Sequence, residues 1–232
     1  MNQELEADAW EVLNGEIVSC RACPRLVAWR EEVARTKRRA YQDLPYWGRP
    51  VPGFGDRQAR LLVLGLAPAA HGANRTGRMF SGDSAGRTLI PALYRAGFAN
   101  QPESEGPGDG LVLRDLFLTA VCRCAPPGNR PTPQEICNCW RFWTRELELL
   151  PRLRVVVALG HVAFEAYVRW YREQGALSGR PAFGHGVLVR PEGDLPVLIG
   201  SYHPSRQNTN TGRLTPPMLD EVFRRARSLL EE

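Results

Sequence analysis

Four short apolar runs do most to restrict the fold of this chain. They cover residues 60–66, 116–121, 154–159 and 196–200, and they hold hardly any polar residues. Strands buried on both faces of a sheet have this pattern, whereas half-exposed strands alternate between apolar and polar residues. Stretches with helical periodicity separate the runs, and such an order predicts a parallel sheet covered by helices on both faces.

The expected elements make one domain. Two stretches rich in Pro and Gly, 40–58 and 99–110, are predicted to be loops. A length of 232 residues suffices for a single core. We therefore expect the α/β class, as a three-layer α/β/α domain over 1–232 with a central, mostly parallel four-stranded sheet. The predicted helices cover residues 24–38, 84–97, 133–150, 161–173 and 215–231.

Composition excludes several classes of protein. Hydrophobic residues make up 43% and charged residues 24%, which excludes a disordered or coiled-coil chain. No run reaches the roughly 18 apolar residues of a membrane helix, and the acidic first residues, with no apolar run behind them, do not resemble a secretory signal. A cytoplasmic protein is the expectation. The net charge of +5 suits a polyanionic partner.

Lysine is nearly absent from the chain. Lys37 is the only one among 30 basic residues, and it lies in the basic run 35–39. Enzymes that form a Schiff base need an amine, and here only Lys37 or the N-terminus could supply one. Imine chemistry is therefore not expected.

The six cysteines form three close pairs. In a cytosolic chain they are not expected to form disulfides, and some of them suit small buried apolar positions. A C-x2-C pair, however, closes a turn that presents two thiolates to one ion or cluster. We predict a four-thiolate site, and spacing alone does not separate zinc from an iron–sulfur cluster. The pairs are Cys20 and Cys23, Cys122 and Cys124, and Cys137 and Cys139.

The segments that follow the predicted strands carry the polar chemistry. In open parallel sheets the ligand binds outside the carboxyl ends of the strands. Gly allows close backbone approach there and Pro stiffens the loop. The segments are GLAPAAHG at 65–72, TGRMFSGDSAG at 76–86, CAPPGNRPTP at 124–133 and YHPSRQNTNTGR at 202–213.

These segments, together with CRACPRL at 20–26, resemble the iron–sulfur-containing uracil-DNA glycosylases, and family 5 of them most closely. The matches run in order from about residue 20 to 215. The resemblance implies the uracil-DNA glycosylase-like fold and a monofunctional hydrolase that removes uracil from DNA at the start of base excision repair. It also implies a [4Fe–4S] cluster that ties the N-terminal segment to the domain.

The resemblance assigns the cluster ligands to four of the cysteines. Cys122 and Cys137 are left over, and residues two apart on a helix, such as 137 and 139, do not share a face. The implied ligands are Cys20, Cys23, Cys124 and Cys139.

Two residues are candidates for catalysis. Asp83 would be the general base for the attacking water. In related enzymes the loop after the first strand carries a polar or acidic residue for this task, but here that stretch, 66–69, is apolar. Its alternative role is to cap the helix that begins there. His203 would donate to the departing base as negative charge develops on it. A structural histidine is the alternative.

The base is expected to meet a second group of residues. Gly65 and Ala67 would form the wall, Phe80 would stack on the flipped base, and Asn129 would contact base or water. A core aromatic and a turn residue are the alternatives for the last two. Ala120 stands where other branches place the Asn that reads uracil, so hypoxanthine and xanthine are expected substrates too.

The DNA is expected to be held at the minor groove. Arg206, Gln207 and Asn208 would enter where the base has left, and Arg78 would contact a phosphate. Solvated surface side chains are the alternative. The expected partners are damaged DNA and downstream abasic-site repair enzymes, with no membrane, and a monomer is expected.

Three other functions stay open on sequence alone. One is a non-catalytic nucleic-acid-binding protein with a structural zinc or cluster site. Another is a hydrolase of free nucleosides or nucleotides on the same fold, and the third is a glycosylase homologue that binds uracil sites without turnover. A cluster protein is brown and a zinc protein colourless, and binding to DNA weakens steeply with salt.

Overall fold

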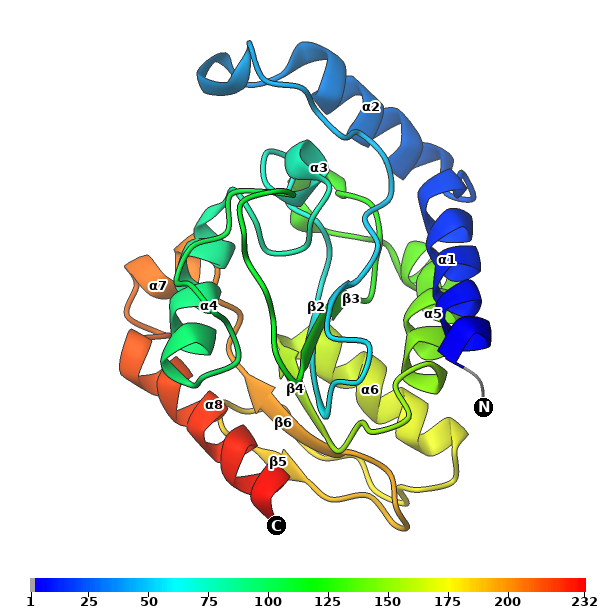
Figure 1. Ribbon diagram of the computed structural model, residues 1–232, viewed down its shortest axis with the longest axis vertical. Helices are drawn as coiled ribbons and strands as arrows, with labels where there is room; N and C mark the ends of the chain where they lie inside the picture. Colours follow the sequence, from blue (N-terminus) through cyan, green and yellow to red (C-terminus); the bar gives the residue numbers. More distant parts are fainter. Residues whose placement is uncertain (1–2) are drawn as a thin grey trace.

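The computed structural model describes residues 3–232, which fold into three layers around a twisted sheet (Figure 1). The described residues form a six-stranded sheet in the order β1-β3-β2-β4-β6-β5. Its four central strands are parallel, with Leu61 beside Leu116 and Val155 beside Val197. They are β2 (Leu61–Gly65), β3 (Leu116–Ala120), β4 (Val155–Leu159) and β6 (Val197–Ser201).

The α/β class and the four central strands are confirmed, but the predicted strand number is too low. Two short antiparallel strands, β1 (Phe54–Gly55) and β5 (Leu188–Val189), close the edges of the sheet. A two-residue strand has no periodicity of its own, because its pairing depends on the neighbouring long strand.

Alternate residues of the central strands enter different cores. Leu61 and Val63 pack with one helical layer and Leu62 and Leu64 with the other, as the period of two in a strand requires. The first layer holds α4 (Ser84–Arg95) and α8 (Pro216–Glu231), and the second holds α5 (Pro133–Glu148) and α6 (His161–Glu173). All four helices match predicted ones to within two residues.

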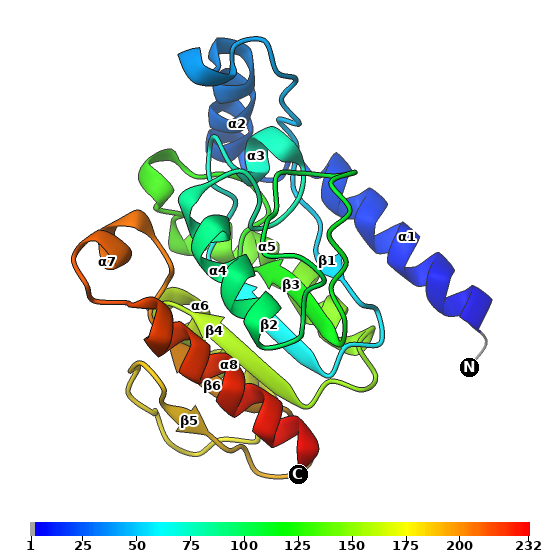
Figure 2. The same ribbon diagram turned by 60° about the vertical axis from the view of Figure 1, so that its left-hand side comes forward.

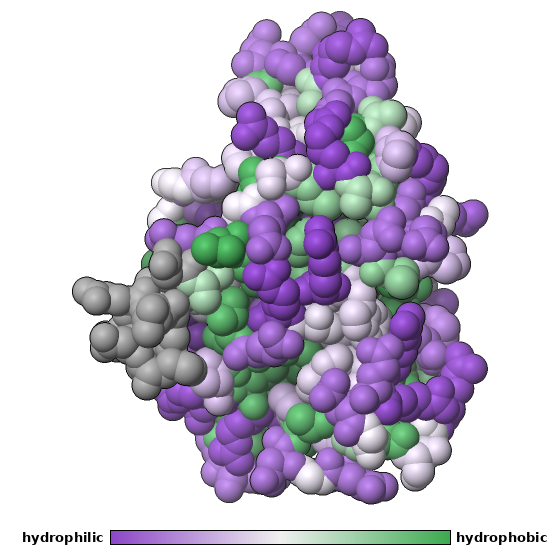
Figure 3. All heavy atoms as spheres, turned by 90° about the vertical axis from the view of Figure 1, so that its right-hand side faces the viewer, coloured by the Kyte–Doolittle hydropathy of each residue, from purple (hydrophilic) through white to green (hydrophobic). Residues whose placement is uncertain are grey.

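The N-terminal part adds two helices outside these layers. Helix α1 (Gln3–Ser19) was not predicted. It lies along α5, where Glu16 pairs with Arg145 and Trp10 packs on Phe117. Helix α2 (Pro24–Thr36) extends beyond the carboxyl edge of the sheet (Figure 2). The face on the side of α1 is mostly hydrophilic, with apolar side chains scattered over it (Figure 3).

Short helical turns occur between the long elements. They are η1 (Arg39–Tyr41), α3 (Ala73–Thr76), η2 (Pro127–Asn129) and α7 (Arg206–Asn210). Within residues 3–232 no helix is both long and apolar enough to cross a bilayer.

Candidate active site

A cavity of about 520 Å³ lies at the carboxyl edge of the sheet. It is formed where β2, β3 and β6 end, with the loop of α7 at its side (Figure 2). The structure therefore brings the motif segments that follow these three strands together in one place. Of the residues predicted to meet the substrate, the lining contains Ala67, Phe80, Asp83, Asn129, His203, Arg206 and Gln207.

Gly65 and Phe80 form one wall as a unit. Gly65 ends β2, and a Cβ there would lie 2.7 Å from Cζ of Phe80. The ring thus packs directly on the glycine, which is why Gly65 itself does not line the cavity. Phe80 has φ +53°, a left-handed conformation that is strained for any residue other than glycine. Tight packing of the loop holds it there, since a Cβ at Gly86 would lie 2.3 Å from the Phe80 carbonyl oxygen.

Asp83 both caps a helix and lines the cavity. Its Oδ1 accepts a hydrogen bond of 2.8 Å from the backbone N–H of Gly86, in the first turn of α4. Its Oδ2 faces Gly72, where a Cβ would come within 2.4 Å. Burial raises the pKa of Asp83, although backbone N–H groups and the nearby Arg87 and Arg75 oppose the rise. A raised pKa makes the carboxylate a better proton acceptor, which suits a general base.

His203 lies two residues beyond β6, and its ring lines the cavity. Burial lowers the pKa of His203 to about 4, so the imidazole is neutral at pH 7. The backbone is fixed by Asn208, whose Nδ2 donates to the His203 carbonyl oxygen over 2.9 Å. Gly160 packs against the other side of the residue, since a Cβ there would lie 3.3 Å from the His203 Cβ. A neutral imidazole held in this way can donate one N–H to a ligand.

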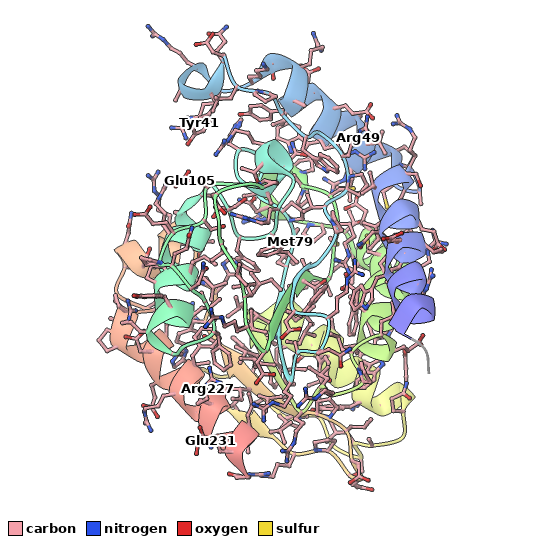
Figure 4. All side chains as sticks on the ribbon, in the orientation of Figure 1. Tyr41, Arg49, Met79, Glu105, Arg227 and Glu231 are labelled. Atoms are coloured by element: carbon pink, nitrogen blue, oxygen red, sulfur yellow. The ribbon has the colours of Figure 1, made fainter. Side chains whose placement is uncertain are left out.

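The rest of the wall is largely apolar. Ala67 follows β2 and Ala120 is the last residue of β3, and both line the cavity. Asn129 is exposed at the rim with φ +56° in the turn of η2, so it is both a turn residue and a polar side chain at the cavity. Met79, near the centre of Figure 4, also lines the cavity and was not predicted. Its only signal was its place beside Phe80 in the motif.

The predicted DNA-contacting residues separate into two groups. Arg206 and Gln207 are exposed at the mouth of the cavity, at the start of α7. Asn208 is half-buried and is used within its own loop, where it binds the His203 carbonyl group. It supports the loop and does not line the cavity, and its contact with DNA stays a prediction.

Arg78 is also placed differently from the prediction. Its guanidinium is buried, with 5% of the side chain exposed, and is paired with Asp109. It also donates to Ser104 Oγ over 3.0 Å. The expected phosphate contact is therefore wrong in this conformation: Arg78 joins the 76–86 segment to the loop at 104–109. Arg78 and backbone N–H groups together hold the pKa of Asp109 far below its usual range, despite the opposing effect of burial.

The predicted cluster ligands gather at the base of α2. Cys23 and Cys124 pack together with Leu26, while Cys20 packs against the cluster of buried residues that contains Cys139. Burial raises the pKa of the Cys23 thiol, and the nearby Cys139 and Cys20 add to the rise. As their side chains stand, no three His, Cys, Asp or Glu residues within 3–232 surround a common metal position.

The surroundings of these sulfur atoms nevertheless fit a four-thiolate site. Cys124 Sγ accepts from the buried Arg30 guanidinium over 2.9 Å, and Cys23 Sγ accepts from Asn138 Nδ2 over 3.3 Å. Such N–H donors suit thiolate ligands. Cys137 is exposed, which favours Cys139 as the ligand from α5. Cys122 is buried against Cys139, in the small apolar position expected for an extra cysteine.

Helix α2 holds both loops that flank the cavity. Arg25 binds Glu135 through two hydrogen bonds, of 2.8 and 2.7 Å, and donates to the carbonyl oxygen of Arg130 over 3.1 Å. On the other side, Asn74 Nδ2 donates to the carbonyl oxygens of Arg30 and Ala70, each over 3.3 Å. The segment that carries the C-x2-C pair thus supports the walls of the cavity.

The chain is similar to characterised proteins over most of its length. A family model described as the Uracil DNA glycosylase superfamily matches residues 52–227. A "Type-5 uracil-DNA glycosylase" of Mycobacterium tuberculosis is 54% identical over 94% of this chain and 80% of its own length. One of Thermus thermophilus is 53% identical over 92% of this chain and 94% of its own. A "Type-4 uracil-DNA glycosylase" of Archaeoglobus fulgidus is 31% identical over 82% of this chain and 78% of its own.

Proposed function

This chain belongs to the uracil-DNA glycosylase superfamily, and from that premise we propose that it removes uracil from DNA as a monofunctional glycosylase. The observation that carries the proposal is the cavity at the carboxyl edge of the sheet, which unites Phe80, Asp83 and His203. The reaction hydrolyses the N-glycosidic bond and leaves an abasic site, the substrate of the next repair enzymes.

The base enters the cavity after it has left the duplex. An enzyme can reach this bond only when the nucleotide is rotated out of the stack. The Phe80 ring offers the base a flat apolar surface, and Arg206 and Gln207 at the mouth would fill the gap left in the duplex. The energy of unstacking is offset by these contacts.

Asp83 serves the sugar side of the reaction. As the bond breaks, positive charge grows on the deoxyribose, and a carboxylate nearby stabilises it. The same carboxylate accepts a proton from the attacking water. Its Oδ1 is fixed by the Gly86 N–H, which orients the group without a second side chain.

His203 serves the departing base. Negative charge develops on a base carbonyl oxygen, and an N–H donor in a buried site stabilises it strongly. Because burial keeps the pKa of His203 near 4, the donor is the neutral imidazole. It stabilises the anion without delivering a full proton beforehand.

We extend the proposal to other deaminated bases. The walls formed by Ala67 and Ala120 offer no side-chain hydrogen bond with which to read uracil. A site that selects strictly needs such groups, because their loss of a partner penalises the wrong base. Hypoxanthine and xanthine are therefore proposed substrates.

The four cysteines Cys20, Cys23, Cys124 and Cys139 are proposed to hold a [4Fe–4S] cluster. Once bound, the cluster supplies a cross-link between segments distant in the sequence. This cross-link would fix the position of α2, from which Arg25 and Arg30 bind the loops of the cavity.

The test is excision from duplexes that carry a single uracil, hypoxanthine or xanthine. The parent should release all three bases, and His203→Ala should lose most of its activity on each. His161→Ala is the matched control, since His161 is an exposed histidine on α6. Equal activity of His203→Ala and the parent would remove the proposed role, and excision of uracil alone would remove the wider substrate range.

A further inference from the structure

Arg30 is a buried cation without a buried carboxylate. Its side chain is only 2% exposed, in the middle of α2. The nearest acidic group is Glu31 at 3.9 Å, which is 46% exposed and already bound by Arg21 at 2.5 Å. A buried charge is costly unless an opposite charge or strong acceptors compensate it. The compensation of Arg30 must therefore lie elsewhere.

The guanidinium of Arg30 is directed at the cysteine site. Its Nη1 lies 2.9 Å from Cys124 Sγ, and Nη1 and Nη2 donate to the Cys20 carbonyl oxygen over 3.3 and 3.2 Å. Its Nε is buried and has no partner among the described residues. A neutral thiol is a weak acceptor and carries no charge, whereas a thiolate provides both an acceptor and the missing negative charge.

We propose that Arg30 is the buried counter-cation of the cysteine-held cluster. Its N–H groups donate to the Cys124 sulfur and its charge balances the net negative charge of the thiolate-ligated cluster. This inference rests on the proposed cluster and adds to it a residue, outside the ligands, that decides how firmly the cluster is held.

The same residue connects the cluster site to the cavity. The Arg30 carbonyl oxygen accepts from Asn74 Nδ2, and that amide also binds the Ala70 carbonyl oxygen in the loop after β2. Asn74 is fully buried. This contact is made by the backbone of Arg30, so it links the middle of α2 to the loop after β2 without depending on the side chain that faces the sulfur atoms.

The test compares Arg30→Met and Arg30→Lys with the parent, all purified without oxygen. Arg21→Met is the matched control, since Arg21 lies inside the C-x2-C motif but points to Glu31 and solvent. Three quantities are measured: iron per chain, the rate at which an iron chelator removes the visible absorbance, and the Fe–S stretching bands in resonance Raman spectra.

We expect Arg30→Met to lose its absorbance at least about tenfold faster than the parent, since a charge-assisted hydrogen bond to a buried sulfur is removed. Arg30→Lys keeps the charge and should fall between the two, with shifted Fe–S bands. Arg21→Met should behave as the parent does.

The outcomes separate the two proposals. A parent without iron removes the proposed cluster, whatever Arg30 does. A parent with iron whose Arg30→Met variant bleaches at the parent's rate, with the same Raman bands, overturns the role of Arg30. Should Arg30→Met not accumulate as folded protein, unchanged bands and bleaching in Arg30→Lys overturn it instead.

Discussion

At the scale of single residues, Asp83 caps a helix and also lines the cavity, so the capping and the proposed catalytic role, which sequence reasoning treated as alternatives, are compatible. One carboxylate oxygen caps α4 and the other packs against Gly72, and the residue lines the cavity. An amide at this position could still accept from the Gly86 N–H, but it could not take a proton from water. The two roles can therefore be separated by substitution.

Asp83→Asn is expected to lower the single-turnover rate of uracil excision by about 10²–10⁴-fold, because a general base is lost. Its thermal stability should stay close to that of the parent. Asp83→Ala should lose the activity and in addition about 1 kcal/mol of stability, because the helix cap is gone. Asp220→Asn, at an exposed ion pair with Arg95, is the control. A fully active Asp83→Asn would contradict the role in catalysis.

The pH dependence should show a single acid limb. Burial raises the pKa of Asp83, and the working form is the carboxylate, so the excision rate should fall as pH drops through that raised value. Burial lowers the pKa of His203 to about 4, so this residue stays neutral and adds no limb between about pH 5 and 8. A single-turnover pH profile measures this. A second limb that vanishes in His203→Ala would show that the imidazolium takes part.

Side-chain direction is what the sequence could not supply. Ala67, Phe80, Asp83, Asn129 and His203 reach one cavity because parallel strands bring their following segments to the same edge. By contrast, the phosphate contact predicted for Arg78 is wrong and the Asn208 amide binds within its own loop, because motif position does not reveal whether a polar side chain faces the ligand or its own loop.

At the scale of elements, the long strands and helices were predictable and the short ones were not. A run such as 61–65 is apolar throughout because both its faces are covered. Helix α1 has only a weak division into apolar and polar faces, so no helical period marks it in the sequence, although it packs against α5. The two-residue edge strands β1 and β5 are defined only by their pairing with β3 and β6, which no pattern in their own residues reveals.

Helix α2 supports the η2 turn through one side chain, which allows a test at this scale. Arg25→Gln removes the pair with Glu135 and the hydrogen bond to the Arg130 carbonyl oxygen. We expect a several-fold rise in KM for uracil-containing duplex, with a smaller change in kcat, because Asn129 sits on the turn that is released. Arg224→Gln, at an exposed pair on α8, is the control. An unchanged KM would show that the turn keeps its shape unaided.

At the scale of the whole molecule, the single lysine lies outside the cavity, whereas arginines line it. Lys37 follows α2, where its Nζ donates to the Gln42 carbonyl oxygen, and it does not line the cavity. No other lysine exists in the chain. The arginines that line the cavity are Arg130 and Arg206, and a guanidinium can bind phosphate but forms no imine.

The product should therefore be an intact abasic site. After complete excision, the DNA strand should break only on treatment with alkali, and borohydride should trap no covalent protein–DNA complex. Lys37→Arg should leave the excision rate unchanged, because the amine is remote from the cavity. Trapping by borohydride, or strand cleavage without alkali, would contradict the monofunctional mechanism.

Binding to DNA should weaken with salt, and Arg206 should contribute to that dependence. If its exposed guanidinium contacts a phosphate, Arg206→Ala lowers the slope of log K against log salt by about 1. Arg180→Ala, at an exposed pair with Glu165, should leave the slope unchanged. Equilibrium titrations of abasic-site duplex at several salt concentrations measure it, and equal slopes would exclude the contact.

The single lysine beside α2 also has a practical use. Besides the α-amino group, amine-reactive reagents have one side chain to modify, and it lies outside the cavity. A fluorophore or a biotin coupled there would give preparations labelled at one known side chain. Single-molecule imaging of the protein searching along stretched DNA could then be attempted without engineering a cysteine, which would risk interfering with the six thiols already present.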